Sequence, residues 1–178
     1  MSRCANVLLA GSLICALAVP ASAANIFCTV TGAKQGVFAG DSNRRGSQIE
    51  VFALTEELKS PRDPATGQVT GKRQHQPLII VKELDRSSPQ FFAAAVENET
   101  LKSVSCTMYR NGADGASHAY YKVVLTNATI VDLKDSGDGV NGAAQGDERE
   151  RISFVFQKIE LTDLDSGTVA QDDWETPI

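Results

Sequence analysis

The stretch Pro77–Arg110, PLIIVKELDRSSPQFFAAAVENETLKSVSCTMYR, decides the fold, because two strand patterns flank one short helix pattern. The first strand, Pro77–Leu84, is rich in β-branched residues. The second, Leu101–Arg110, alternates strictly between apolar and polar side chains, with Val104 and Cys106 on the apolar face. Such alternation is typical of a strand that buries one face and exposes the other.

The helix between these strands begins with a recognisable signal. Ser87 and Ser88 can cap the helix, and Pro89 suits the first helical position. The pattern predicts a short helix that runs to about Asn98. We expect the following residues to face the core: Phe91, Phe92, Ala95 and Val96.

Similar strand patterns lie on both sides of this stretch. The clearest are residues 25–30, 48–55, 119–134 and 151–161. In the second of them, we expect Ile49, Val51 and Ala53 to share one face. About eight strands and one helix indicate an antiparallel sandwich or barrel with the helix packed outside.

A long segment without apolar periodicity, Lys59–Gln76, separates two of these strands and contains two prolines and two glycines. The pattern predicts a loop of about 18 residues, and loops of this length in compact domains usually bind a partner or serve a function. It holds Lys72, Arg73 and His75, in the one positive cluster of an acidic chain. The cluster is either a solvated surface or a contact to an acidic patch, which a second copy of the chain could supply.

The N-terminal residues resemble a secretory signal peptide. Arg3 gives a positive start, Val7–Val19 is an apolar run, and Ala21–Ala23 fits the small-x-small pattern before a cleavage site. We therefore expect a signal peptide at residues 1–23, with cleavage between Ala23 and Ala24.

Residues 24–178 are then expected to form one domain. The apolar run of the leader is too short for a stable membrane anchor, so no anchor is expected in the mature chain. The alternative is a misassigned start codon shortly before Asn25, which would leave the protein in the cytoplasm.

Charge and cysteine content restrict the partners. The chain has 17 basic and 22 acidic residues, and loss of Arg3 with the leader leaves a net charge of −6. This argues against nucleic acid as a ligand, because nucleic acid selects basic surfaces. Two cysteines remain after cleavage, Cys28 and Cys106, and they could form either one disulfide or two buried free thiols.

The sequence offers no catalytic or metal-binding pattern. The two histidines, His75 and His118, lie on separate predicted loops, and no further histidine or cysteine stands at ligand spacing. No serine lies in a nucleophile-elbow pattern. We therefore expect neither an enzyme nor a bound metal or cofactor.

An ordered set of residues resembles the Hcp family, the tube proteins of bacterial type VI secretion systems. The set runs through GKRQHQP at Gly71–Pro77, then Pro89, Leu101 and Tyr109-Arg110. The resemblance continues through Tyr120–Lys134, Glu150–Thr162 and Asp172–Trp174, and so covers nearly all of the mature chain.

The resemblance implies two antiparallel β-sheets that form a small barrel with one flanking helix. It also implies rings of six copies that stack into a hollow tube, together with spike and effector proteins as partners. In the family the long loop reaches toward neighbouring subunits, which assigns subunit contacts to these residues: Arg62, Asp63, Lys72, Arg73 and His75.

The leader departs from this family, whose members are usually cytoplasmic before they are fired. Two functions therefore stay open. The chain is either a tube subunit that carries effectors, or an exported or periplasmic binding module that has kept the fold without a contractile apparatus. In either case we expect a secreted protein, exported by the signal peptide or through the type VI apparatus.

Overall fold

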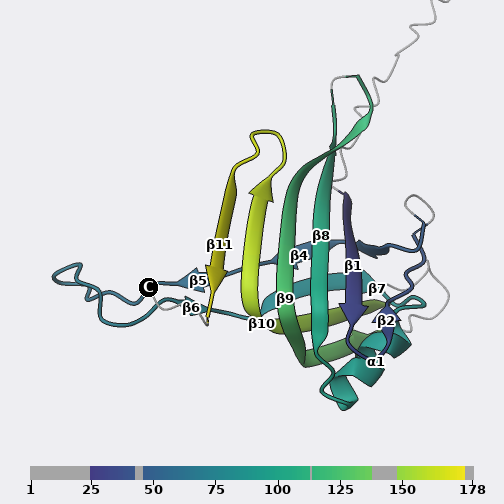
Figure 1. Cartoon of the computed structure of the whole chain (residues 1–178), viewed down its shortest axis with the longest axis horizontal. Helices are drawn as coiled ribbons and strands as arrows, with labels where there is room; N and C mark the ends of the chain where they lie inside the picture. The colour runs from purple at the N-terminus through teal and green to yellow at the C-terminus, as the bar shows by residue number, and fades with distance from the viewer. Residues whose placement is uncertain (1–24, 43–45, 113, 138–147, 175–178) are drawn as a thin grey trace, which may run out of the picture.

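The structure is a computed structural model that describes residues 25–42, 46–112, 114–137 and 148–174. Within these residues it contains eleven strands and one helix, compared with the eight or so strands and one helix that the sequence predicted (Figure 1). The predicted signal peptide, including Ala23 and Ala24, lies outside the described residues. In chain order the elements are β1 (Asn25–Gly32), β2 (Gly36–Val37), β3 (Ile49–Val51), β4 (Ala53–Thr55), β5 (Leu58–Lys59), β6 (Gln74–His75), β7 (Leu78–Glu83), α1 (Ser88–Val96), β8 (Leu101–Asn111), β9 (Ser117–Ser136), β10 (Arg149–Asp163) and β11 (Val169–Asp173).

The two antiparallel sheets are unequal in size. Nine strands form the main sheet, in which the order β2-β1-β8-β9-β10-β7-β4 is extended by β11 beside β10 and by β3 beside β1. The second sheet contains only β5 and β6. The expected mainly β fold with antiparallel sheets and one helix is confirmed, although one sheet carries nearly all of the structure.

Strand β10 divides one edge between two partners. Residues 149–154 pair with β7, whereas residues 158–162 pair with β11. The other edge of β10 pairs with β9 along nearly its whole length. Residues 155–157 therefore lie at a fork, where β7 and β11 diverge from a common neighbour.

A short segment links the two ends of the main sheet. β3 pairs with β1, β4 pairs with β7, and only Phe52 separates β3 from β4. The backbone N–H of Phe52 donates to the carbonyl of Val81 over 2.8 Å. Strand pairing therefore does not close the main sheet into the expected barrel, and its two ends are linked through this continuous segment.

The interruption at Phe52 corrects the predicted strand 48–55. Ile49 and Val51 are buried, as expected, but Ala53 is exposed. The uninterrupted alternation that we assumed does not hold across the break, because the chain leaves β1 and joins β7 there.

The helix α1 lies at the end of the strands opposite the β8–β9 turn (Figure 1). Phe91 is fully buried and packs its ring 5.1 Å from that of Phe38 and 6.3 Å from that of Phe154. The prediction that Phe92 and Val96 face the core is wrong, because their exposures are 60% and 64%. A nine-residue helix lying on one side of a sheet buries only one narrow stripe.

A buried carboxylate ties the residues after α1 to the β1–β2 turn. Glu99 Oε1 accepts the backbone N–H groups of Lys34 and Gln35 over 2.6 and 2.9 Å. Burial acts to raise the pKa of Glu99, but these hydrogen bonds and that of the Gln35 amide outweigh it and lower the pKa. Gly32 leaves the room, because a Cβ there would stand 2.4 Å from Glu99 Oε1.

The two cysteines face each other across β1 and β8. Cys28 and Cys106 are register partners with Cα atoms 4.0 Å apart, and the structure joins them in a disulfide. Both are buried, with exposures of 0% and 1%. The disulfide therefore links β1 covalently to β8 inside the core.

The structure corrects part of the prediction that residues 59–76 form a loop. Its ends pair as β5 and β6, and Arg62 forms a further antiparallel bridge with Val69. Residues 58–75, which we call the arm, therefore fold as an extended two-stranded arm that projects from the body (Figure 1). Sparse apolar residues hid these short strands from a reading based on hydrophobic periodicity.

Replacement of both core cysteines by alanine should lower the free energy of unfolding by about 2–4 kcal/mol relative to the oxidised protein. The bridge spans a sequence separation of 78, so it restricts a long loop in the unfolded chain. Urea unfolding measures the difference. Reduced wild type, which keeps both sulfur atoms in the core, is the control. Equal unfolding midpoints for oxidised and reduced wild type would show that the bridge contributes no stability.

Candidate functional site

The arm presents the residues that the sequence assigned to subunit contacts, and the structure divides them between its tip and its base. At the tip, Arg62 donates through Nη1 to the carbonyl of Gly67 over 3.2 Å. Asp63 Oδ1 accepts the backbone N–H groups of Ala65 and Thr66 over 2.7 and 3.1 Å. These hydrogen bonds lower the pKa of Asp63, so its carboxylate closes the turn at the tip.

At the base, one carboxylate holds two residues of the arm. Arg73 forms a bidentate ion pair with Asp172 of β11 through Nε and Nη2. His75 Nε2 lies 2.8 Å from Asp172 Oδ2, and the His75 side chain is only 7% exposed. The hydrogen bond from Arg73 is the main cause that lowers the pKa of Asp172 to about 2. Asp172 thus fastens the arm to the body by two charge-assisted contacts.

The base of the arm also borders a pocket of about 370 Å³ at the fork of β10. The rings of Phe156 and Trp174 each lie 5.5 Å from the His75 ring, in edge-on orientation. The lining residues are His75, Gln76, Val155, Phe156, Gln157 and Trp174.

Of the five predicted contact residues, Arg62 and Lys72 are exposed, whereas Arg73 and His75 are half-buried and paired with Asp172 of the body. Lys72 makes no ion pair within the described part of the chain. Among the predicted contact residues, Arg62 and Lys72 are therefore the basic side chains that can meet another molecule. The sequence could not separate Lys72 from Arg73, because only the fold brings Asp172 to the base of the arm.

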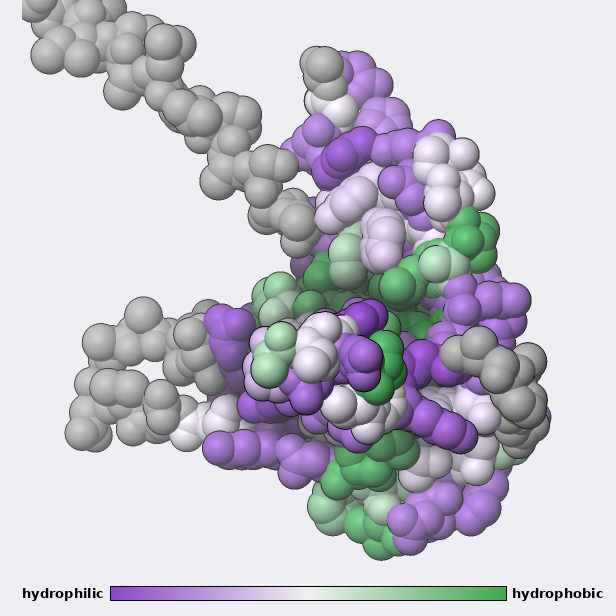
Figure 2. Space-filling view, turned by 90° about the vertical axis from the view of Figure 1, so that its left-hand side faces the viewer, coloured by the Kyte–Doolittle hydropathy of each residue, from purple (hydrophilic) through white to green (hydrophobic). Residues whose placement is uncertain are grey.

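Figure 2 views the molecule from the side toward which the arm projects, and shows hydrophobic surface above and below it. Exposed apolar side chains occur on the arm itself, where Leu58 is 51% and Val69 is 61% exposed. These apolar side chains lie on the same arm as the exposed charges of Arg62 and Lys72.

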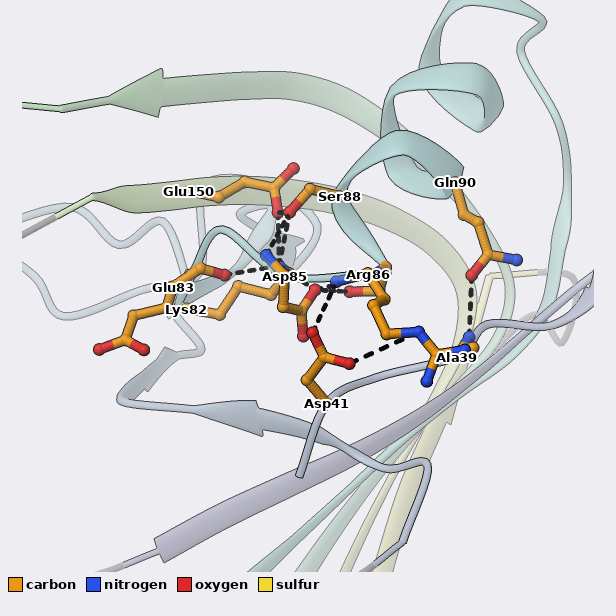
Figure 3. Close-up of polar contacts among 10 residues, drawn as sticks. Ala39, Asp41, Lys82, Glu83, Asp85, Arg86, Ser88, Gln90 and Glu150 are labelled. Atoms are coloured by element: carbon orange, nitrogen blue, oxygen red, sulfur yellow. Dashed lines mark hydrogen bonds and ion pairs between the residues drawn. The ribbon is translucent and has the colours of Figure 1, made fainter. Parts of the chain in front are cut away.

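A second polar cluster joins α1 to the sheet and was not anticipated (Figure 3). Lys82 Nζ lies 2.7 Å from Glu150 Oε2, 2.8 Å from Asp85 Oδ1 and 2.9 Å from Ser88 Oγ. The side chains of Lys82 and Glu150 are completely buried. A lysine inside an apolar strand pattern was the available signal, but its partner in β10 is 68 positions away.

The contact between Lys82 and Ser88 does not form a nucleophilic dyad. The Lys82 ammonium group donates to Ser88 Oγ and lies against the carboxylates of Asp85 and Glu150. A general base must instead accept the hydroxyl proton of the nucleophile. Ser88 Oγ instead donates to Glu150 Oε2 and accepts the N–H of Asp85, which fixes the start of α1.

Residues 25–42, 46–112, 114–137 and 148–174 contain no group of three or more metal-ligating side chains. In the same ranges, no helix has the length and apolar character needed to cross a membrane.

A curled antiparallel sheet, one flanking helix and a projecting arm define a class of small, mainly β proteins, and comparison with known proteins identifies the family. The profile of the family described as "Type VI secretion system effector, Hcp" matches residues 27–162. The chain belongs to this family, the Hcp proteins of type VI secretion systems.

Relatives support this assignment over nearly the whole length. The chain is 36% identical over 165 residues to the "Major exported protein" of Pseudomonas aeruginosa, which covers 85% of this chain and 96% of that protein. It also resembles the solved structure of a secreted Hcp protein from P. aeruginosa, with a TM-score of 0.71, 30% identity and coverage of 86% and 100%. A further Hcp crystal structure matches with a TM-score of 0.78 at 22% identity, covering 84% and 99%, which shows the shared fold.

The contacts of Asp172 with Arg73 and His75, which we call the Asp172 clamp, predict that the free energy of unfolding depends on pH. Because folding lowers the pKa of Asp172 from 3.8 to about 2, its contribution is present above pH 3.8 and is lost as the pH falls through about 2. Asp172→Asn should therefore lower the free energy of unfolding near neutral pH by no more than about 2 kcal/mol, since the pair is partly exposed to solvent.

Urea unfolding of wild type and Asp172→Asn across this pH range tests the prediction. The difference between the two proteins should shrink toward zero at the acid end. Asp132→Asn, on an exposed position of β9, is the matched control and should show no such convergence. A difference that stays constant with pH would contradict the role given to the Asp172 charge.

Proposed function

We propose that this chain is the structural subunit of a type VI secretion tube, which assembles into rings of six copies that stack and enclose effector proteins. Membership of the Hcp family supports the secretion system. Spike and effector proteins of that system are the partners that this function requires. No chemical step is assigned to the protein.

The projecting arm is the observation that carries this proposal. A closed ring needs a heterologous interface, in which two different patches of each subunit meet. The arm can supply one patch, because residues 58–75 extend from the body and are anchored at the base by Asp172. Exposed strand edges and apolar surface on the body can supply the other. A stable contact of this kind buries at least about 1,000 Å².

A second candidate is an exported binding module that keeps the fold but acts without a contractile apparatus. The leader pattern and the buried Cys28–Cys106 bridge favour it, because disulfides persist in oxidising compartments. The relative from P. aeruginosa is itself described as an exported protein. Both candidates are secreted proteins. They differ in whether the chain assembles into rings, and in whether it leaves the cell through the type VI apparatus or by its signal peptide.

The arm should matter for assembly and not for folding. Wild type should scatter light as a particle of about six subunits at micromolar concentration. Replacement of both Arg62 and Lys72 by Glu should give a monomer with an unchanged far-ultraviolet circular dichroism spectrum, because like charges at an interface cost several kcal/mol.

Two outcomes would decide against these expectations. A wild type that remains monomeric over the whole concentration range would contradict the ring. A double variant that remains hexameric would show that the charges of the arm are only solvated. A variant with Lys102→Glu, at an exposed position of β8, is the control for added negative charge and should assemble normally.

The export route predicts a particular covalent state of the protein purified from its native cell. We expect the intact mass of a chain that starts at Ala24. We also expect that Cys28 and Cys106 are not alkylated under denaturing, non-reducing conditions, because the disulfide protects them. Two alkylated cysteines on such a chain would remove the bridge but keep the export by leader. A chain that still carries residues before Ala24 would favour a tube subunit that waits in the cytoplasm.

A further inference from the structure

The imidazole ring at the base of the arm lies between two carboxylates. His75 Nε2 is 2.8 Å from Asp172 Oδ2, and His75 Nδ1 is 3.6 Å from Glu56 Oε1. The His75 side chain is 7% exposed, whereas those of Asp172 and Glu56 are 25% and 27% exposed. The ring is thus the most buried of the three groups, and it connects the arm to carboxylates from two other parts of the chain.

Both nitrogens of the ring face an acceptor. The pKa of Asp172 is lowered to about 2, mainly by the hydrogen bond from Arg73, so its carboxylate is ionised and can only accept. Nε2 must therefore carry a proton. Nδ1 is buried and has no hydrogen-bond partner among the described residues. A neutral ring would turn a lone pair of Nδ1 toward Glu56, whereas an imidazolium turns an N–H group toward each carboxylate.

The charges around the ring favour the same form. Arg73 already neutralises Asp172, and Glu56 has no other ion pair in the described ranges of the chain. The two aromatic rings that pack edge-on against the imidazole carry no charge. With a neutral His75 the cluster would be net negative, whereas an imidazolium balances it. The geometry thus suits a charged ring even though the ring is buried.

We propose that the protonation of His75 regulates the arm: the charged ring fastens the base of the arm to Asp172 and Glu56, and loss of its proton loosens it. Histidine is the side chain that changes its charge between about pH 5 and 8. Contacts made by the charged form are complete on the acid side and are lost as the pH rises through the titration of the ring. The consequence for assembly rests on the proposed ring of subunits, whereas the fastening of the arm does not.

The first experiment follows the proton on His75 directly. Trp174 is the one tryptophan of the chain, and its ring centroid lies 5.5 Å from that of His75. Because a protonated imidazole quenches indole fluorescence more strongly than a neutral one, Trp174 emission should rise between about pH 5 and 8. His75→Gln should abolish this rise. His118→Gln, which removes an exposed imidazole at the start of β9, is the control and should keep it.

Matched variants show whether the second carboxylate favours the charged ring. Glu56→Gln should move the midpoint of the emission change to lower pH by about one unit, which is a tenfold loss of proton affinity. Glu57→Gln should leave the midpoint unchanged, since Glu57 is exposed and pairs with Lys59. An emission change that does not depend on His75, or equal midpoints in both glutamate variants, would overturn the proposal.

The second experiment measures how firmly the arm is held. The pairing of β5 with β6 and the hydrogen bond from the Gln76 N–H to the Glu57 carbonyl, over 2.9 Å, close the base of the arm. After correction for intrinsic exchange rates, the protection of these amides should fall about tenfold between about pH 5 and 8, while that of the β8 amides stays constant. Protection that does not change, or that falls equally in His75→Gln, would contradict the role of the charged ring.

Light scattering at the same two pH values tests the consequence for assembly. A loosened arm must be ordered again when it binds a neighbour, so the concentration needed for assembly should be about tenfold higher at the alkaline pH. In His75→Gln it should be the same at both. Assembly of wild type that does not depend on pH would overturn the regulation of the ring. Protein that assembles at neither pH overturns the ring itself, and the emission and exchange measurements still decide whether His75 fastens the arm.

Discussion

The division of β10 between two partner strands is the constraint on which the rest of the molecule depends. A strand has two hydrogen-bonding edges, and β10 gives one of them to β9. Its other edge serves β7 over residues 149–154 and β11 over residues 158–162. Since β7 and β11 cannot occupy the same space, the sheet opens at residues 155–157. The pocket lies at this opening, and the base of the arm lies beside it.

The two polar clusters stabilise the two sides of this fork. On the β7 side, Lys82 and Glu150 form a completely buried ion pair that also engages the start of α1. Buried pairs of this kind add little net stability compared with apolar packing, but loss of one partner leaves a costly unpaired charge. On the β11 side, Asp172 holds Arg73 and His75 in a partly exposed contact. The first cluster fixes the body, and the second fixes the arm relative to the body.

The Asp172 clamp changes how the basic cluster of the arm is understood. In the sequence Lys72, Arg73 and His75 form one run of similar residues. In the fold, Arg73 lies just before β6 and pairs with Asp172 of β11, whereas Lys72 remains exposed. Membership of the Hcp family agrees with a role of the arm between subunits, but the side chain available for that role is a property of this fold.

Local sequence patterns were enough to predict those strands and helix ends at which the burial of each side chain follows one regular pattern. Strict alternation marked β8 and the apolar side of β1, and the serine–proline signal marked the start of α1. Patterns failed where the environment changes within an element: at Phe52 between β3 and β4, at Phe92 and Val96 on α1, and in the arm, whose strands bury little apolar surface. The pairings of Cys28 with Cys106, Lys82 with Glu150 and Arg73 with Asp172 were decided only by the tertiary structure. Each joins positions that are 68 to 99 residues apart, and single-sequence periodicity contains information only about near neighbours on the same strand or helix.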